Sequence, residues 1–436
     1  MFPLEISVHG GARSLLLLLA AGGASLFLAA EILLAGAVFS FHTSSQGRRI
    51  AAIDRDDPRL EYRLGEMYGD IDPAVSVAHL HRAVELSPHS RRYWSHLASA
   101  CVSRGDTQCA RQAWEFLATL CPMVPIYRLH AAESYVLTNQ ADQSVVQFHR
   151  LLHMDPTYGP IIWFDLSQIL KPDDLFQKML AGETDDDIKL SYVYFLSTHE
   201  EKEAAYRIWK LIVASPRPFK FESAKPYLER LIDLDRIEEA ESVWQDLQQL
   251  GIVREPEPSE IGALVFNGDF EHAPLDAGFD WRLADRLTYL ALDFAAPGAF
   301  RGSRCLRLDF TVERNDEYEP VYELVPVLPN HTYQLQAEVR SEDITSTSGP
   351  RLRVVDPQPA SLEDVQTEPT VGTTPWHPLH ASFSTGPHTH VVRLSLWRPR
   401  GRAFPTEISG SFWLDAVSLS DTGLAVAQVG TPDASR

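Results

Sequence analysis

Two places in the second half of the chain put a tryptophan directly before an arginine, Trp281–Arg282 and Trp397–Arg398. An aromatic ring can stack on the apolar C–H face of a sugar, and a guanidinium group can bind several of its hydroxyl groups. Because most large aromatic side chains belong to a core, we expect most of these rings to be buried. Trp397, which precedes Arg-Pro-Arg-Gly at the expected end of a strand, is the first candidate for a saccharide contact. Tyr289 and Trp376 are the further candidate platforms.

No motif of a common catalytic class accompanies these residues. The nucleophile elbow, the phosphate-binding loop and the dinucleotide fingerprint are absent, and His199-Glu200 begins like a zinc-protease motif but lacks the second histidine. The sequence therefore predicts a protein that is not an enzyme and needs no cofactor, with a carbohydrate-active enzyme as the less favoured alternative. The four cysteines follow neither C-x-x-C nor zinc spacing, so we expect the three in the helical part to pack between helices, with one disulfide among them as the alternative. They are Cys101, Cys109, Cys121 and Cys305.

The composition is that of a globular protein with more than one domain. The chain has 436 residues, of which 44% are hydrophobic and 22% are charged. This length exceeds what one ordinary core accommodates. The formal net charge is −20 at pH 7. Since nucleic-acid binding needs clustered lysine and arginine, this charge argues against a nucleic-acid partner.

The N-terminal segment is apolar enough to suggest a membrane anchor. Residues 15–41 form an apolar run in which Glu31 is the single charged residue. About 20 apolar residues span a bilayer, so we predict a transmembrane helix at about 15–41 within an anchor at 1–50. A cleaved signal peptide is the alternative, because Ala35-Gly36-Ala37 has the form of a cleavage site.

The charges beside this segment give conflicting indications of orientation. Arg13 flanks one side and Arg48, Arg49, Arg55 and Arg59 flank the other, which favours a cytoplasmic C-terminal part. Long domains translocate largely regardless of flanking charge, and a sugar-binding domain suits an outside location. We therefore expect the soluble part to lie outside the cytoplasm.

Residues 51–253 show a self-similar helical period. Pro88, Pro122 and Pro156 stand 34 residues apart, and each closes a helical stretch. A 34-residue period with a terminal proline is typical of helix-turn-helix repeats that stack into a solenoid. The segment 161–187 does not fit the period, and its acidic run at 183–187 is predicted to be a solvated loop, with a cation site as the alternative.

The repeat that ends at Pro122 carries the clearest pattern. Two helices with small and aromatic residues flank a Gly-Asp turn at 105–106, and the small residues allow close helix packing. The pattern residues are Trp94, Leu97, Ala98, Cys101, Ala110, Trp114 and Leu117. This pattern resembles the tetratricopeptide repeat family. The resemblance implies an all-α solenoid that binds a protein partner, with the aromatic residues in the repeat core.

Beyond a polar linker at 254–261 the periodicity changes to two. Short alternating apolar runs, separated by Gly, Pro, Asn and Asp clusters, fill residues 262–421. This pattern predicts an all-β antiparallel sandwich or jelly roll. A disordered tail is expected at 422–436.

Four segments of the second domain carry a further resemblance. They are NGDFE at 267–271, GAFRGSRCLRLDF at 298–310, LPNHTYQLQAEVRS at 328–341 and WLDAVSL at 413–419. In this order they resemble the galactose-binding-like jelly rolls that serve as carbohydrate-binding modules. The resemblance implies a polysaccharide ligand.

The same resemblance implies a structural calcium ion that ties the first and last strands together. Asp269, Glu271 and Asp415 lie in the matching segments and offer the oxygen ligands that calcium requires. The alternative is that these acids cap turns or pair with arginines.

These features predict an N-terminal transmembrane helix, an all-α tetratricopeptide-type solenoid and a C-terminal all-β jelly-roll sandwich. The two family resemblances together imply a membrane-anchored, non-catalytic scaffold of the bacterial cell envelope, which recruits a protein partner and contacts polysaccharide in exopolysaccharide assembly or export. The expected location is the bacterial inner membrane, crossed once, with the soluble part in the periplasm. The alternative is a purely structural scaffold without sugar binding.

Overall fold

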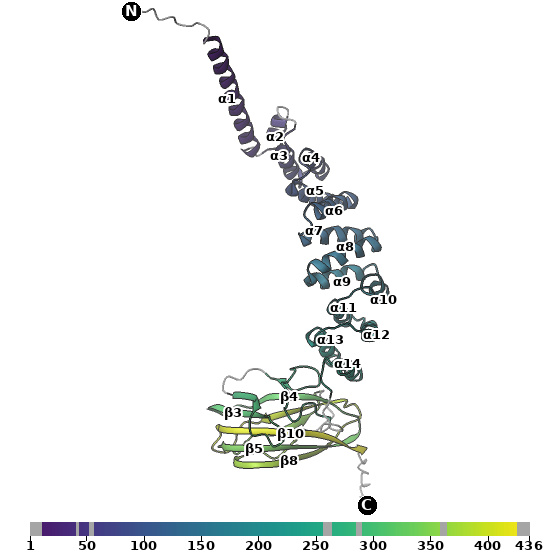
Figure 1. The fold of residues 1–436 in the computed structure, drawn as a ribbon, viewed down its shortest axis with the longest axis vertical. Coiled ribbons are helices and arrows are strands. Elements are labelled where there is room, and N and C mark those ends of the chain that lie inside the picture. Colours follow the sequence, from purple (N-terminus) through teal and green to yellow (C-terminus); the bar gives the residue numbers. More distant parts are fainter. Residues whose placement is uncertain are drawn as a thin grey trace, which may run out of the picture. The chain divides into compact units, whose positions relative to one another are not determined.

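A computed structural model describes residues 11–40, 43–51, 56–255, 264–284, 290–357 and 364–424. The chain divides into two compact units, Met1–Glu183 and Thr184–Arg436. The first unit is helical, and the second contains further helices followed by two β-sheets (Figure 1). A helical repeat region and a β-sheet region are therefore present, as the two periodicities predict.

Short polar caps set the starts of the helices in the first unit. The side chains of Asp57, Asp72, Ser90 and Asp106 each accept a hydrogen bond from a backbone N–H of the first helical turn. The helices are α1 (Gly11–Ser40), α2 (Ser44–Ala51), α3 (Pro58–Tyr68), α4 (Pro73–Leu86), α5 (Arg91–Arg104), α6 (Thr107–Leu120), α7 (Pro125–Leu137), α8 (Ala141–Met154), the 3-10 helix η1 (Pro156–Tyr158), α9 (Gly159–Ser167), α10 (Pro172–Leu175) and the π-helix η2 (Phe176–Leu180).

Within the part of the chain that the structure describes, no helix is both long enough and apolar enough to cross a membrane. The predicted transmembrane helix at about 15–41 is therefore wrong, and so is the single-pass inner-membrane location inferred from it. Helix α1 does form over most of this segment. Its described part includes Glu31 and the glycines at 22, 23 and 36, which are less apolar than the leucines around them.

The helical repeats are confirmed by how α3 to α8 pair. These helices pack as successive hairpins, α3 with α4, α5 with α6 and α7 with α8 (Figure 1). Helices α4 and α6 end at Leu86 and Leu120, just before the periodic prolines. Gly65 allows a close helix contact, because a Cβ at this position would lie 2.5 Å from Leu80 Cγ. The core of this region contains Leu97, Ala98, Cys101, Ala110, Trp114 and Leu117.

A disulfide bond joins the two helices of the second hairpin. Cys101 on α5 and Cys109 on α6 are linked, with 5.7 Å between their Cα atoms. Cys121 and Cys305 are free thiols. The structure thus contains the disulfide that the sequence left as the alternative to packing.

The second unit begins with four helices, α11 (Asp186–Thr198), α12 (Lys202–Val213), α13 (Phe221–Asp233) and α14 (Ile237–Gln249). The Asp186 side chain is buried at the start of α11. It accepts hydrogen bonds from Lys189 Nζ at 2.7 Å and from the Arg217 backbone N–H at 2.7 Å. The acidic run at 183–187 is therefore not a solvated loop, because Glu183 and Asp186 are both buried.

Two five-stranded antiparallel sheets form the rest of the second unit. One has the order β1-β4-β9-β6-β7 and the other β2-β3-β10-β5-β8; β3, β10, β5 and β8 lie in one layer (Figure 1). The strands are β1 (Arg282–Leu283), β2 (Leu290–Ala296), β3 (Cys305–Arg314), β4 (Tyr318–Pro326), β5 (His331–Ile344), β6 (Arg351–Val355), β7 (Val365–Gln366), β8 (Gly372–Ser384), β9 (Val391–Arg398) and β10 (Ile408–Leu424).

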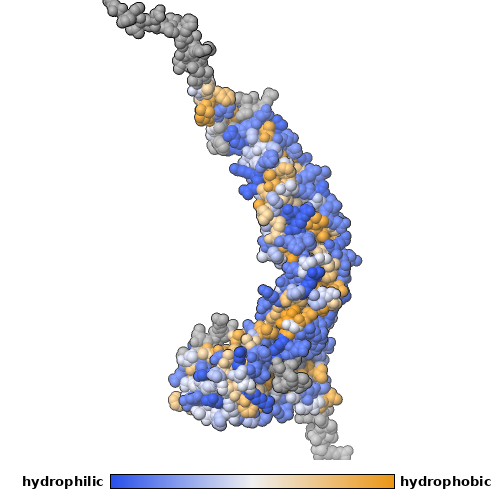
Figure 2. All heavy atoms as spheres, viewed as in Figure 1, coloured by the Kyte–Doolittle hydropathy of each residue, from blue (hydrophilic) through white to orange (hydrophobic). Residues whose placement is uncertain are grey.

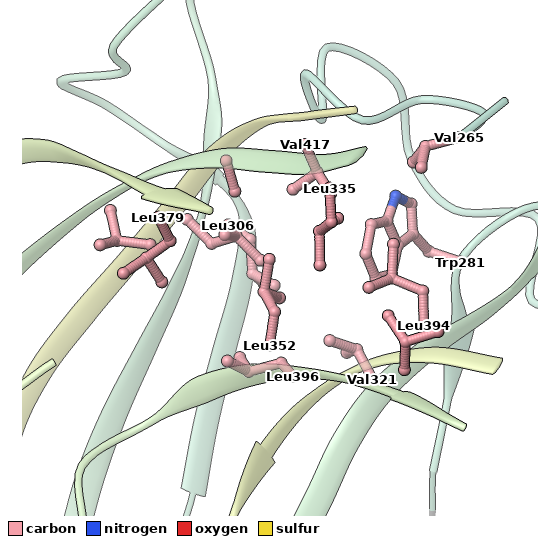
Figure 3. Close-up of a cluster of buried hydrophobic side chains, with 14 of the residues drawn as sticks. Val265, Trp281, Leu306, Val321, Leu335, Leu352, Leu379, Leu394, Leu396 and Val417 are labelled. Carbon is pink, nitrogen blue, oxygen red and sulfur yellow. The ribbon is translucent and has the colours of Figure 1, made fainter. Parts of the chain in front are cut away.

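Apolar side chains from both sheets meet in one core, as alternation in the strands predicts. Figure 3 shows Leu352, Leu394 and Leu396 of one sheet on the side facing Leu306 and Leu335 of the other. Residues 256–261 of the expected linker and 425–436 of the expected tail lie outside the described residues.

The first loop of the sandwich packs on helices α13 and α14. The Trp244 ring lies edge to face against Phe266 and Phe279, at centroid distances of 5.3 and 5.9 Å. Gly278 is close to the same ring, because a Cβ there would lie 2.4 Å from Trp244 Cζ3. The Gly278 N–H donates to Glu229 Oε1 at 2.7 Å. The sandwich and the last two helices therefore share an apolar contact with a polar rim.

Replacing Gly278 should destabilise the protein more than replacing another glycine that has a positive φ. Gly278 has φ +60° and Gly298 has φ +88°, but a Cβ on Gly298 meets nothing within 4 Å. Both alanine variants lose about 1–2 kcal/mol through the left-handed backbone. Gly278→Ala should lose a further 1–3 kcal/mol, roughly, through overpacking against Trp244. Urea unfolding of both variants tests this, and equal losses would contradict the contact.

Candidate functional site

Trp397 lies on the outer face of the sheet that contains β9. Along this strand Val392, Leu394 and Leu396 belong to the core. Successive strand residues point to opposite faces, so Trp397 and Ser395 lie on the other face. Trp397 is also the last residue but one of β9, which ends where loops from other parts of the sandwich meet.

A groove of about 830 Å³ opens beside Trp397. Its polar lining comes from four separate segments of the chain. These lining side chains include Asn315, Glu317, Arg351, Gln366, Arg400 and Arg402. Amide, carboxylate and guanidinium groups around one aromatic residue are the chemistry that sugar hydroxyl groups need.

The Trp397 ring is held firmly and offers little surface to the groove. Its exposed fraction is 8%. The indole Nε1–H donates to Glu317 Oε1 at 3.0 Å. The Arg353 guanidinium lies over the ring at 4.6 Å from its centroid, and that of Arg351 at 5.9 Å. Contacts in the groove would therefore be mainly polar, with the small exposed part of the indole as the apolar contribution.

Arg398 points away from the groove and organises the loops that form it. Its side chain is fully buried. The guanidinium donates from Nε to the Ser348 carbonyl at 3.0 Å, from Nη1 to the Asp316 carbonyl at 2.7 Å and from Nη2 to the Thr406 carbonyl at 2.7 Å. Arg398 therefore has a positioning role, and its predicted role as a direct sugar contact has no geometric support.

A second contact fixes the same loops. Asn315 Nδ2 donates to the Gly401 carbonyl at 3.0 Å, and the Gly401 N–H donates back to Asn315 Oδ1 at 2.7 Å. Gly401 needs this close approach, because a Cβ would lie 2.8 Å from the Thr406 carbonyl oxygen. The groove walls are thus built by backbone contacts that do not depend on a ligand.

The groove carries more positive than negative charge, although the chain is acidic overall. Arg351, Arg400 and Arg402 line it together with the single carboxylate of Glu317. Burial lowers the pKa of Arg351, and the charge of nearby Glu368 opposes this shift. An anionic ligand would offset the cost of burying this guanidinium.

The other predicted sugar-binding residues do not gather at the groove. Trp281 is fully buried in the sandwich core, where its Nε1–H donates to the Asn267 carbonyl at 3.2 Å (Figure 3). Arg282 Nη1 lies 2.6 Å from Glu229 Oε2 on α13. Trp376, half-buried, lies on β8 of the other sheet, 6.0 Å from the Phe300 ring. Tyr289 lies outside the described residues.

Two of the three predicted calcium ligands bind the loop that precedes β3. Glu271 accepts from the backbone N–H groups of Ser303 and Arg304, and Asp415 accepts from those of Phe300 and Arg301. Burial raises the pKa of Asp415, and these hydrogen bonds lower it in part.

The three acids do not converge on one point in the arrangement seen. The carboxylate oxygens of Glu271 and Asp415 already face N–H donors. The ligand atoms of Asp269, Glu271 and Asp415 do not form a group within 4.8 Å of one another. Calcium at these residues stays a prediction that follows from family resemblance.

Sequence reasoning identified Trp397 but missed most of the polar groove. Asn315, Glu317, Arg351 and Gln366 come from strands and loops far apart in the sequence. Their sequence neighbourhoods carry no motif, so only the strand pairing of β9 with β4 and β6 brings them together.

Comparisons with known proteins match parts of the chain at the level of architecture. No protein-family description and no curated protein matches it. Similar solved structures include the MamA protein, with 13% identity, a TM-score of 0.27 and coverage of 40% of this chain and 86% of that one. A tetratricopeptide repeat protein from Parabacteroides merdae has 10% identity, a TM-score of 0.26 and coverage of 48% and 86%.

The β-sheet region has neighbours of a different kind. The carbohydrate-binding module TmCBM61, solved in complex with beta-1,4-galactotriose, has 14% identity, a TM-score of 0.26 and coverage of 36% of this chain and 98% of that one. Because these likenesses are distant, the architecture rests on the helices, strands and contacts described above.

Arg398→Lys should destabilise the sandwich because lysine cannot reach three carbonyl groups at once. Hydrogen bonds from a charged group contribute about 1.5–3 kcal/mol each, so we expect a loss of roughly 3 kcal/mol or more in the free energy of unfolding. Arg314→Lys is the matched control, because Arg314 is half-exposed and pairs with Asp316 on the surface. Its replacement should change the stability by about 1 kcal/mol at most. Urea unfolding that gave equal losses would contradict the positioning role.

Proposed function

We propose that this chain is a non-catalytic binding scaffold. Its helical repeats bind a protein partner, and its β-sandwich binds an acidic polysaccharide in the groove beside Trp397. The groove supports the proposal, because it combines an aromatic side chain with planar polar side chains and an excess of guanidinium groups. A polymer that bears carboxylates, such as a uronate, satisfies both features.

The groove supports binding better than hydrolysis. Most glycosidases use a pair of carboxylates that flank the scissile bond. Among the described residues that line the groove, Glu317 is the single acid, and its Oε1 accepts the Trp397 indole N–H. The proposed role is therefore recognition.

The helical part supports the protein-binding half of the proposal. Stacked helical hairpins expose long faces that suit extended protein ligands. On the face drawn in Figure 2 the helices are mostly hydrophilic, with apolar patches between. Exposed apolar side chains on these helices include Val102, Leu137, Val146, Ile161 and Phe164. We further propose a role in exopolysaccharide assembly or export, which the family resemblance of the two regions supports.

Removing exposed groove side chains should weaken polysaccharide binding without unfolding the protein. We choose the double variant Gln366→Ala with Arg400→Ala, because both residues line the groove and are exposed. The full chain is titrated with alginate as the uronate polymer and with a neutral galactan. Alginate should bind, and the double variant should bind it about tenfold or more weakly, since each contact contributes on the order of 1.4 kcal/mol.

The matched control is Gln334→Ala with Arg304→Ala, which removes an exposed glutamine and arginine outside the groove. It should bind alginate like the wild type. Equal affinity of the groove variant and the control, or binding of neither polymer by the wild type, would refute the saccharide half and leave a structural scaffold. Preference for the galactan with the same loss in the groove variant would refute the acidic specificity.

A further inference from the structure

Two histidines and a glutamate come together at the end of the first unit. His149 and His153 lie on α8, four residues apart, so both imidazoles share one face of the helix. Glu183 follows the π-helix η2 in sequence, 30 residues after His153. Their three ligand atoms all lie within 4.8 Å of one another. Among the described residues, no other group of three His, Cys, Asp or Glu side chains does so.

Both imidazoles lie at a metal-site separation from one glutamate oxygen, and all three ligand atoms lie within 4.8 Å of one another. His153 Nε2 lies 2.9 Å from Glu183 Oε2, and His149 Nε2 lies 3.5 Å from the same oxygen. Ligands about 2.0–2.1 Å from a tetrahedral zinc ion lie roughly 3.3 Å from one another. The observed distances bracket this value.

The surroundings hold Glu183 beside α8 and leave both imidazoles accessible. The Glu183 side chain is 2% exposed, whereas both imidazoles are half-exposed. The Glu183 N–H donates to the Leu180 carbonyl at 3.0 Å. Lys178 Nζ on η2 donates to Asp142 Oδ1 on α8 at 2.6 Å, which is a second link between the same two elements. The π-helix itself is a rare element that often occurs at functional sites.

We propose that His149, His153 and Glu183 form a binding site for a divalent transition-metal ion, with Zn²⁺ as the ion it fits best. Two imidazole nitrogens favour zinc and its neighbours over calcium and magnesium, which prefer sites made wholly of oxygen ligands. Three protein ligands leave a fourth position, which a water molecule or a side chain of a bound partner would take. The ion would link α8 to the turn after η2.

Zinc binding by the purified full chain tests the proposal. The protein is freed of metal by chelator dialysis and titrated with Zn²⁺, Ca²⁺ and Mg²⁺ in separate calorimetric experiments. We expect one equivalent of Zn²⁺ and no comparable binding of the other two ions. Loss of an outer-shell partner alone weakens metal sites by about 10–100-fold. Removal of a direct ligand in His153→Ala or Glu183→Gln should therefore weaken Zn²⁺ binding by at least about tenfold.

His81→Ala is the matched control. His81 also lies beside a glutamate on a helix, with its Nδ1 3.2 Å from Glu85 Oε1, but it has no second histidine ligand. This variant should keep the wild-type affinity. Bound Co²⁺ should give the visible absorption of a tetrahedral site in the wild type and in His81→Ala, and not in His153→Ala.

Three results would overturn the proposal and leave a His–Glu ion pair alone. They are absence of an equivalent of Zn²⁺ in the wild type, unchanged affinity in His153→Ala and Glu183→Gln, and equal weakening in His81→Ala. Circular dichroism of each variant shows whether the helices remain folded. If His153→Ala does not fold, the conservative Glu183→Gln variant decides the outcome.

Discussion

A stack of helical hairpins buries its apolar faces only where a further element covers the last one. In the second unit the sandwich provides this cover for α13 and α14. Trp244 of α14 packs between Phe266 and Phe279 of the first sandwich loop, and Arg282 reaches Glu229 of α13. The tight fit at Gly278 shows that the loop and the helix surface are complementary. The β-domain thus packs directly on the last two helices of its unit.

Inside the sandwich, the buried guanidinium of Arg398 holds together the loops that form the groove. Three loops reach the end of β9, and each brings a carbonyl group that would otherwise lie buried near the others. Arg398 satisfies all three with one rigid planar group. The side chain that the sequence marked as a ligand for sugar therefore supports the surface on which its neighbour Trp397 lies. Adjacent residues of a strand point to opposite faces, so Trp397 and Arg398 cannot both face the same ligand.

Local patterns in the sequence were enough to predict the helical hairpins and the two-layer sandwich. The 34-residue proline period and the alternation in β9 are local signals, and the structure has helices and strands where they occur. The groove could not be predicted, because Arg351 and Gln366 meet Trp397 only through long-range strand pairing. The histidine pair on α8 was readable as an i, i+4 signal, but its third ligand lies far along the chain in a segment without the repeat period. The apolar N-terminal run misled the prediction, since hydropathy alone suggested a membrane crossing that no described helix supports.

Polysaccharide binding in the groove beside Trp397 is the proposal on which the function of the sandwich depends. The chain has nine tryptophans, and the indole N–H of Trp397 donates to Glu317 at the groove wall whereas that of Trp281 is buried in the core. Nitrogen-15 NMR of the tryptophan indoles during titration with an oligouronate measures the two positions in one experiment. We expect the Trp397 indole signal to shift in a saturable way while the Trp281 signal stays in place. An unchanged Trp397 signal in the presence of bound oligouronate would contradict it.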